Sequence, residues 1–165
     1  MKRSRSRRSE PSFGRDRGTG ALVVIALAGL FLAAFLAATP IPFQSELVFL
    51  GMQAAGWGTL ALIVVASIGN TLGSCVTYGL GRWLSDQRDH RWFPLTPAQM
   101  ARAEVWWGRW GRWLLLLSWA PFGDMIVALS GVLRVPVPVF LLLVALAKTG
   151  RYIVLGWLGS AAFGA

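Results

Sequence analysis

The 165-residue chain has only one cysteine, Cys75, and one histidine, His90. A single cysteine cannot form an intramolecular disulfide. The lone histidine has no second histidine or cysteine near it, so a zinc site is not expected. Nor does the sequence offer a nucleophile, a base and an orienting residue that would act together. We therefore predict no metal, no cofactor and no enzymatic activity.

Charged residues are also scarce. They make up 14% of the chain, where soluble domains have about 25%. Hydrophobic residues account for 55%, and there are 19 glycines and nine tryptophans. Glycine permits close packing of membrane helices, and tryptophan gathers at membrane surfaces. This composition predicts an all-α integral membrane protein and excludes an ordinary soluble domain.

The positive charge is concentrated at the N-terminus. Residues 1–17 contain seven basic and two acidic residues, which is +5 of the total +9. Such a tail could bind nucleic acid. It directly precedes an apolar segment, however, and the positive-inside rule then explains it better, with a cytoplasmic N-terminus and no nucleic-acid partner. We predict a disordered basic tail at 1–19, too polar to form a core, and one membrane domain at 20–163.

Five apolar segments follow the tail, and the fourth of them is residues 113–131. Residues 20–38 and 58–80 are long enough to cross the membrane as helices, at about 1.5 Å per residue. Residues 139–163 form the last span. Residues 43–55 contain Glu46 and are too short to cross, so we expect a re-entrant half-helix there.

The polar middle of the chain, residues 82–112, should contain an amphipathic helix. Thr96, Pro97 and Gln99 form a capping-box pattern that marks a helix start. Arginines and four tryptophans follow, which indicates either a helix in the lipid headgroup layer or an aromatic belt at the end of a span. We expect Gly79-Leu80-Gly81-Arg82 to end the preceding helix at the cytoplasmic surface.

The charge distribution also predicts the topology. The tail and the polar middle are both basic and should both be cytoplasmic. Residues 113–131 are then expected to enter and return as a second re-entrant segment, which leaves Arg134, with Arg82, at a cytoplasmic rim. The alternative is that 113–131 crosses fully.

The two halves of the chain share a spacing. The interval from Glu46 to Asn70 equals the interval from Asp124 to Lys148. A break follows each acid, at Gly56-Trp57-Gly58 in one half and at Arg134-Val135-Pro136 in the other. With the two re-entrant segments entering from opposite faces, this pattern predicts an inverted repeat, as in transporters whose site lies at the repeat interface.

Four ionisable residues lie in apolar segments: Glu46, Asp124, Lys148 and Arg151. Each charge at mid-membrane costs about 2.5–3.5 kcal/mol, so they must pair, reach water or be neutralised. Lys148 and Arg151 are three residues apart and share a helix face. We predict one pocket in which these two cations face both acids, with Asn70 as a neutral hydrogen-bonding partner.

The roles within this pocket follow from the chemistry of the side chains. Removing a carboxylate from water favours its protonated form, so Glu46 or Asp124 could carry protons. The planar fork of Arg151 suits a phosphate, and Lys148 supplies a compact charge. A static salt-bridge network is the alternative, but buried ion pairs are a weak source of stability. We therefore predict a substrate- and ion-binding site.

Several motifs together resemble the YqaA branch of the DedA family, also called the VTT-domain or SNARE-associated Golgi protein superfamily. The resemblance covers about residues 20–160. The motifs are Ser45-Glu46, Gly69-Asn70-Thr71-Leu72-Gly73, Tyr78-Gly79-Leu80-Gly81-Arg82, Ser118-Trp119-Ala120-Pro121-Phe122-Gly123-Asp124, Gly131, Arg134, Lys148 and Arg151-Tyr152.

The resemblance implies paired re-entrant segments, a bacterial inner-membrane location and a role in envelope homeostasis that depends on the proton motive force. Some DedA proteins are implicated in returning undecaprenyl phosphate across the membrane, and eukaryotic relatives scramble phospholipids. Glu46 resembles the family's early membrane acid. The usual pattern has arginines where this chain has Ser118 and Asp124, which indicates a charge swap within one pocket or a different substrate.

We therefore expect a multi-pass inner-membrane transporter or lipid flippase. Its partners would be protons and either a membrane lipid, such as polyprenyl phosphate or phospholipid, or a small anionic solute. The alternative is a non-transporting scaffold that docks other proteins through the basic tail and the tryptophan-rich helix. The sequence leaves open whether the chain forms a homo-oligomer.

Overall fold

The computed structural model describes residues 15–39, 44–87, 96–120 and 123–163. These residues form six α-helices and one short 3-10 helix and contain no strand, which confirms the predicted all-α fold. The elements are α1 (Arg15–Ala37), α2 (Ser45–Ala54), α3 (Thr59–Asp86), α4 (Pro97–Leu116), η1 (Leu117–Trp119), α5 (Gly123–Val132) and α6 (Val137–Phe163).

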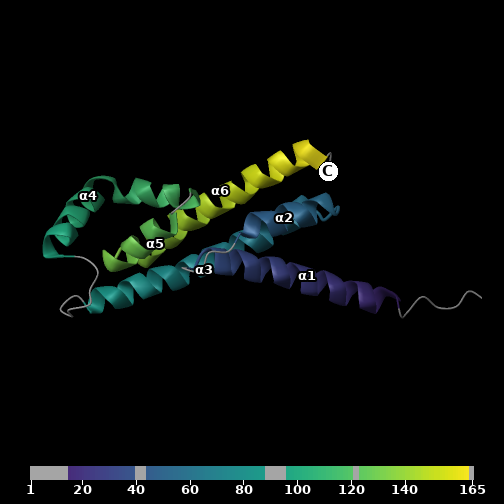
Figure 1. Ribbon diagram of the computed structural model, residues 1–165, viewed down its shortest axis with the longest axis horizontal. Coiled ribbons are helices and arrows are strands. Elements are labelled where there is room, and N and C mark those ends of the chain that lie inside the picture. Colours follow the sequence, from purple (N-terminus) through teal and green to yellow (C-terminus); the bar gives the residue numbers. More distant parts are fainter. Residues whose placement is uncertain (1–14, 40–43, 88–95, 121–122, 164–165) are drawn as a thin grey trace, which may run out of the picture.

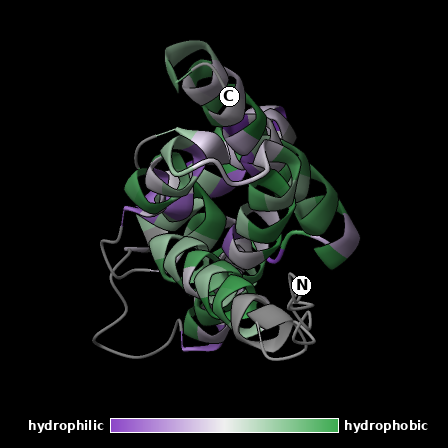
Figure 2. Cartoon of the chain, turned by 90° about the vertical axis from the view of Figure 1, so that its right-hand side faces the viewer, coloured by the Kyte–Doolittle hydropathy of each residue, from purple (hydrophilic) through white to green (hydrophobic). Residues whose placement is uncertain are grey.

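Three of the helices are long and apolar enough to cross a membrane: residues 20–37 of α1, all of α3 and all of α6. Large hydrophobic side chains on these helices remain exposed, among them Leu22, Leu60 and Trp157. Figure 2 shows hydrophobic residues along much of the length of the helices. An outer surface of this kind would be unstable in water and suits a lipid environment.

Two helix boundaries differ from the prediction. Helix α1 begins at Arg15, so residues 15–19 of the predicted tail are helical, and the rest of that tail lies outside the described residues. Helix α3 does not end near Gly79 and Gly81 but continues to Asp86. The prediction was wrong because Gly81 serves tertiary packing: a Cβ there would overlap the backbone of Ala128 in α5.

The predicted capping box at the start of α4 is confirmed. The Gln99 backbone N–H donates to Thr96 Oγ1 (3.3 Å), and the Thr96 backbone N–H donates to Gln99 Oε1 (2.8 Å). The segment predicted at 113–131 is divided among the end of α4, the helix η1 and α5, rather than forming one helix.

The helices of the two halves are related by one constant offset in residue number. Helices α2 and α5 begin at 45 and 123 and end at 54 and 132, and the starts of α3 and α6, at 59 and 137, differ by the same amount. The same offset moves the end of α1 from 37 to 115, and α4 ends at 116. The repeat therefore covers three helices in each half, and α4 is the counterpart of α1.

The short helix of each half packs against the long helix of the other half. In one half, Gln53 of α2 donates to the carbonyl oxygen of Gly156 in α6 (2.8 Å). The residues at the equivalent positions of the repeat are Gly131 in α5 and Tyr78 in α3. These two are also in close contact, because a Cβ on Gly131 would overlap the Tyr78 carbonyl oxygen. Each short helix thus packs on the long helix of the other half, and Figure 1 shows α2 and α5 toward opposite ends of the α3–α6 pair.

The glycine motif on α3, Gly69 and Gly73, packs against α1. A Cβ at Gly69 or Gly73 would overlap the carbonyl oxygens of Phe31 and Phe35. Small residues at this spacing let two membrane helices approach closely. Beside this contact lies a core cluster that includes Phe49, Leu62 and Tyr152.

Candidate functional site at the interface of the two halves

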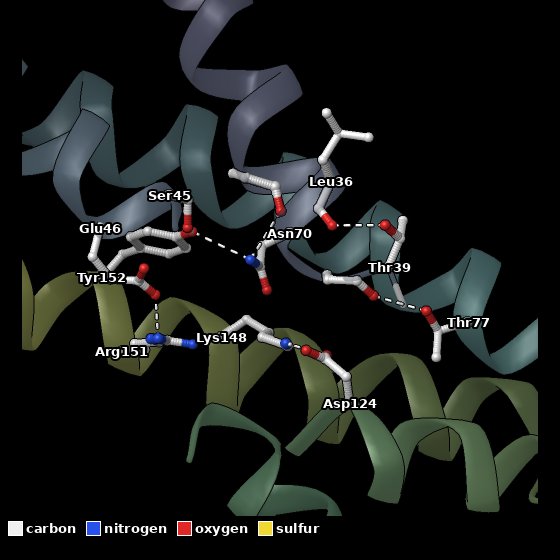
Figure 3. A network of polar contacts seen from close by, with 12 residues as sticks. Leu36, Thr39, Ser45, Glu46, Asn70, Thr77, Asp124, Lys148, Arg151 and Tyr152 are labelled. Atoms are coloured by element: carbon white, nitrogen blue, oxygen red, sulfur yellow. Dashed lines mark hydrogen bonds and ion pairs between the residues drawn. The ribbon is translucent and has the colours of Figure 1, made fainter. Parts of the chain in front are cut away.

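Both membrane acids lie in the first turn of a short helix. Glu46 is the second residue of α2, and Asp124 is the second residue of α5. The N-terminus of a helix carries a partial positive charge that stabilises a carboxylate. The two acids occupy equivalent positions in the repeat, and each faces α6 (Figure 3).

The two cations on α6 pair with these acids. Arg151 donates to the carboxylate of Glu46, and Lys148 Nζ donates to Asp124 Oδ1 at 2.9 Å. Glu46 belongs to the first half of the chain and Arg151 to the second. The Glu46–Arg151 pair therefore joins the two halves, whereas the Lys148–Asp124 pair lies within the second half.

The two ion pairs differ in burial. The Lys148 side chain is 1% exposed, although its partner Asp124 is 35% exposed. The side chains of Arg151 and Glu46 are 30% and 25% exposed. Lys148 is thus enclosed within the protein, while the other three charges reach its surface.

Next to the charges lies a hydrogen-bond chain that the sequence alone did not identify as part of the site. The hydroxyls of Ser45 and Tyr152 are 2.8 Å apart, and Asn70 Nδ2 donates to the Tyr152 hydroxyl (3.3 Å) and to the carbonyl oxygen of Ala34 (2.9 Å). Asn70 therefore contacts this chain rather than a charged group. The sequence did hold one indication that Ser45 and Tyr152 belong to the site: Ser45 directly precedes Glu46, and Tyr152 directly follows Arg151.

Several buried oxygens have no hydrogen-bond partner among the described residues. On α3 these are Ser67 Oγ, Asn70 Oδ1 and Ser74 Oγ, and Ser118 Oγ in η1 is another. In Figure 3 the amide oxygen of Asn70 points toward α6, on the side where Lys148 lies. Buried polar atoms are usually satisfied, so this interior is suited to take up water or a polar ligand group.

The predicted rim residues Arg82 and Arg134 lie apart from this site. Arg82 donates to the Tyr78 hydroxyl (3.2 Å), which itself donates to the Val135 carbonyl oxygen (2.6 Å). Arg134 contacts Asp86 at the end of α3. Both arginines therefore gather around the turn between α5 and α6.

A cavity of about 520 Å³ opens beside the Glu46–Arg151 pair. The rest of its wall is apolar or glycine, and includes Trp119, Leu146 and Val154. One ion pair on an otherwise hydrophobic wall is suited to an amphiphilic ligand, with a charged head at the pair and an apolar tail along the wall.

The chain is similar to known membrane proteins. A family model described as the VTT domain matches residues 41–161. The chain is 35% identical over 140 residues to an uncharacterized protein of Haemophilus influenzae, with 79% of this chain and 85% of that protein covered. It is 33% identical over 134 residues to the inner membrane protein YqaA of Escherichia coli, with 78% and 87% covered.

No solved structure matches the chain. The family match covers well over half of the sequence, and both relatives are covered over most of their length, so the predicted resemblance is confirmed. The chain belongs to the VTT-domain family, in the YqaA branch of the DedA proteins, and is a multi-pass inner-membrane protein.

Proposed function

We propose that the protein moves an anionic lipid, such as polyprenyl phosphate or an anionic phospholipid, across the membrane in a proton-coupled manner. The observation that carries this proposal is the Glu46–Arg151 pair on the wall of an apolar cavity. A lipid phosphate could bind Arg151 while the lipid tail lies against Leu146 and Val154.

The pairing suggests how protons are coupled to the lipid. A carboxylate and a phosphate bind an arginine fork in the same bidentate way, so they compete for it. While Glu46 is ionised it occupies Arg151. Protonation of Glu46 removes this competitor and frees the guanidinium for a phosphate. Loss of the proton then restores the ion pair and expels the lipid.

The second pair places the Lys148 side chain inside the protein. Lys148 is enclosed and held by Asp124, beside buried oxygens that have no partner among the described residues. These groups offer hydrogen bonds to a headgroup or to water that passes between the halves. A charged group in transit would otherwise meet only apolar surroundings.

The test is reconstitution in liposomes that contain labelled polyprenyl phosphate, phosphatidylglycerol or phosphatidylcholine. Wild-type protein should move the anionic lipids and leave phosphatidylcholine in place. Arg151→Gln should slow anionic-lipid movement about tenfold, the loss expected when one charge-assisted hydrogen-bonding partner is removed. Arg82→Gln, which changes an arginine far from the pair, is the matched control and should leave the rate unchanged.

Two results would reject the proposal. One is equal movement by wild-type protein and Arg151→Gln. The other is no lipid movement by folded wild-type protein, which would favour a scaffold that acts by docking other proteins.

A further inference from the structure

The turn between α5 and α6 has an unusual backbone. Gly56 has φ = 85°, and Arg134, at the equivalent position of the repeat, has φ = 54°. Arg134 is the one non-glycine residue with positive φ in the part of the chain that the structure describes. The left-handed conformation is unfavourable for a residue with a Cβ. The first half has glycine at this position, which adopts the conformation without that cost, so the second half carries an arginine where glycine would be less strained.

The visible contacts of Arg134 do not account for that cost. Its Nε donates to Ser85 Oγ at 3.3 Å, and one terminal nitrogen pairs with Asp86. The side chains of this ion pair are 55% and 54% exposed, and exposed ion pairs contribute less to stability than the left-handed backbone costs. The other terminal nitrogen of the guanidinium donates to none of the described residues, which leaves it available as a donor.

A cavity of about 630 Å³ lies beside Arg134. Across it is Arg109 of α4, which has no ion pair within the residues that the structure describes. The same wall carries three tryptophans, Trp107, Trp110 and Trp113. Figure 1 shows α4 beside α5.

The tryptophan wall is built by the sequence of α4. A Cβ at Gly111 would overlap the ring of Trp107, so this glycine lets the ring lie flat across the helix. Trp107 also packs against the core cluster that contains Tyr78 and Phe140. Trp110 and Trp113 remain 54% and 67% exposed. Tryptophan with a buried face and an accessible edge is typical of the membrane–water interface.

We propose that this cavity binds the phosphate group of an anionic phospholipid between Arg109 and Arg134. Two guanidinium groups supply charge and forked donors for phosphate oxygens. The tryptophans hold the headgroup region at the membrane surface. This site is separate from the Glu46–Arg151 pair and does not depend on the proposed function.

Native mass spectrometry of the detergent-solubilised full chain tests this site, with phosphatidylglycerol as the probe and phosphatidylcholine as the neutral lipid. Arg134→Gly should weaken phosphatidylglycerol binding about tenfold through loss of a charge-assisted contact. It should remain folded because glycine relieves the left-handed backbone. Arg109→Gln should weaken binding to a similar degree. Asp86→Asn is the matched control: it breaks the same ion pair, and binding should stay equal or become tighter.

The proposal fails if Arg134→Gly binds phosphatidylglycerol as wild type does. It also fails if Asp86→Asn loses as much binding as Arg134→Gly, because Arg134 would then serve only the ion pair. Equal binding of phosphatidylcholine would refute anion recognition. Displacement of the lipid by millimolar inorganic phosphate would identify a free anion, rather than a lipid, as the ligand.

Discussion

Asp124→Asn is expected to destabilise the folded protein by about 3 kcal/mol, because it leaves the Lys148 ammonium buried and unpaired. Lys148 is 1% exposed, and Asp124 is the acid that pairs with it among the described residues. This loss of free energy is at the lower end of what breaking a buried ion pair costs, because the Asp124 side chain is 35% exposed. The free energy of unfolding in mixed micelles, measured by denaturant titration, gives this value.

The double variant Asp124→Asn with Lys148→Met separates structure from function. Replacing both members of a buried ion pair with neutral groups is often neutral for stability, so the double variant should recover most of the lost free energy. It should not recover lipid movement if the charge is needed inside the protein. A double variant as unstable as Asp124→Asn alone would contradict the assignment of the destabilisation to an unpaired Lys148.

Gly81→Ala is expected to destabilise the protein by about 1–3 kcal/mol through overpacking. The added methyl group would overlap the backbone of Ala128, which cannot move aside as a flexible side chain could. Gly79→Ala, two residues away, is the matched control. Nothing lies within 4 Å of a Cβ at Gly79, so alanine should leave stability unchanged or raise it by up to about 1 kcal/mol through helix propensity.

Thermal unfolding of both variants in the same detergent makes this comparison. If Gly79→Ala and Gly81→Ala shift the midpoint equally, α3 and α5 do not approach closely at Gly81. Gly131→Ala provides a second test of the same contact, since its Cβ would overlap the Tyr78 carbonyl oxygen.

The sequence predicted those features that depend on composition and spacing. Scarce charge and long apolar segments predicted the helical membrane fold. The shared interval from Glu46 to Asn70 and from Asp124 to Lys148 predicted the repeat, and the high cost of charge in a membrane predicted that acids and bases would pair. Composition, residue spacing and the cost of a charge in a membrane can all be read from the sequence, so these features could be predicted before the structure was known.

Other features required the tertiary structure. The sequence of α4 bears little likeness to that of α1, so only the shared offset of helix ends shows that they are counterparts. Tyr152 belongs to the hydrogen-bond chain through its contact with Ser45, which is 107 residues away in the sequence. Glycine is common both at helix ends and where two helices pack closely, so the sequence around Gly81 could not show which of the two applies. For Tyr152 and Gly81 the decisive neighbour lies far away in the sequence.

Proton coupling through Glu46 is tested most directly in liposomes with an imposed pH gradient. Wild-type protein should move labelled polyprenyl phosphate faster with the gradient than without it. Glu46→Gln, which keeps the side-chain shape but cannot titrate, should move the lipid at a rate that no longer responds to the gradient. A Glu46→Gln protein that still responds as wild type does would contradict proton coupling through this residue.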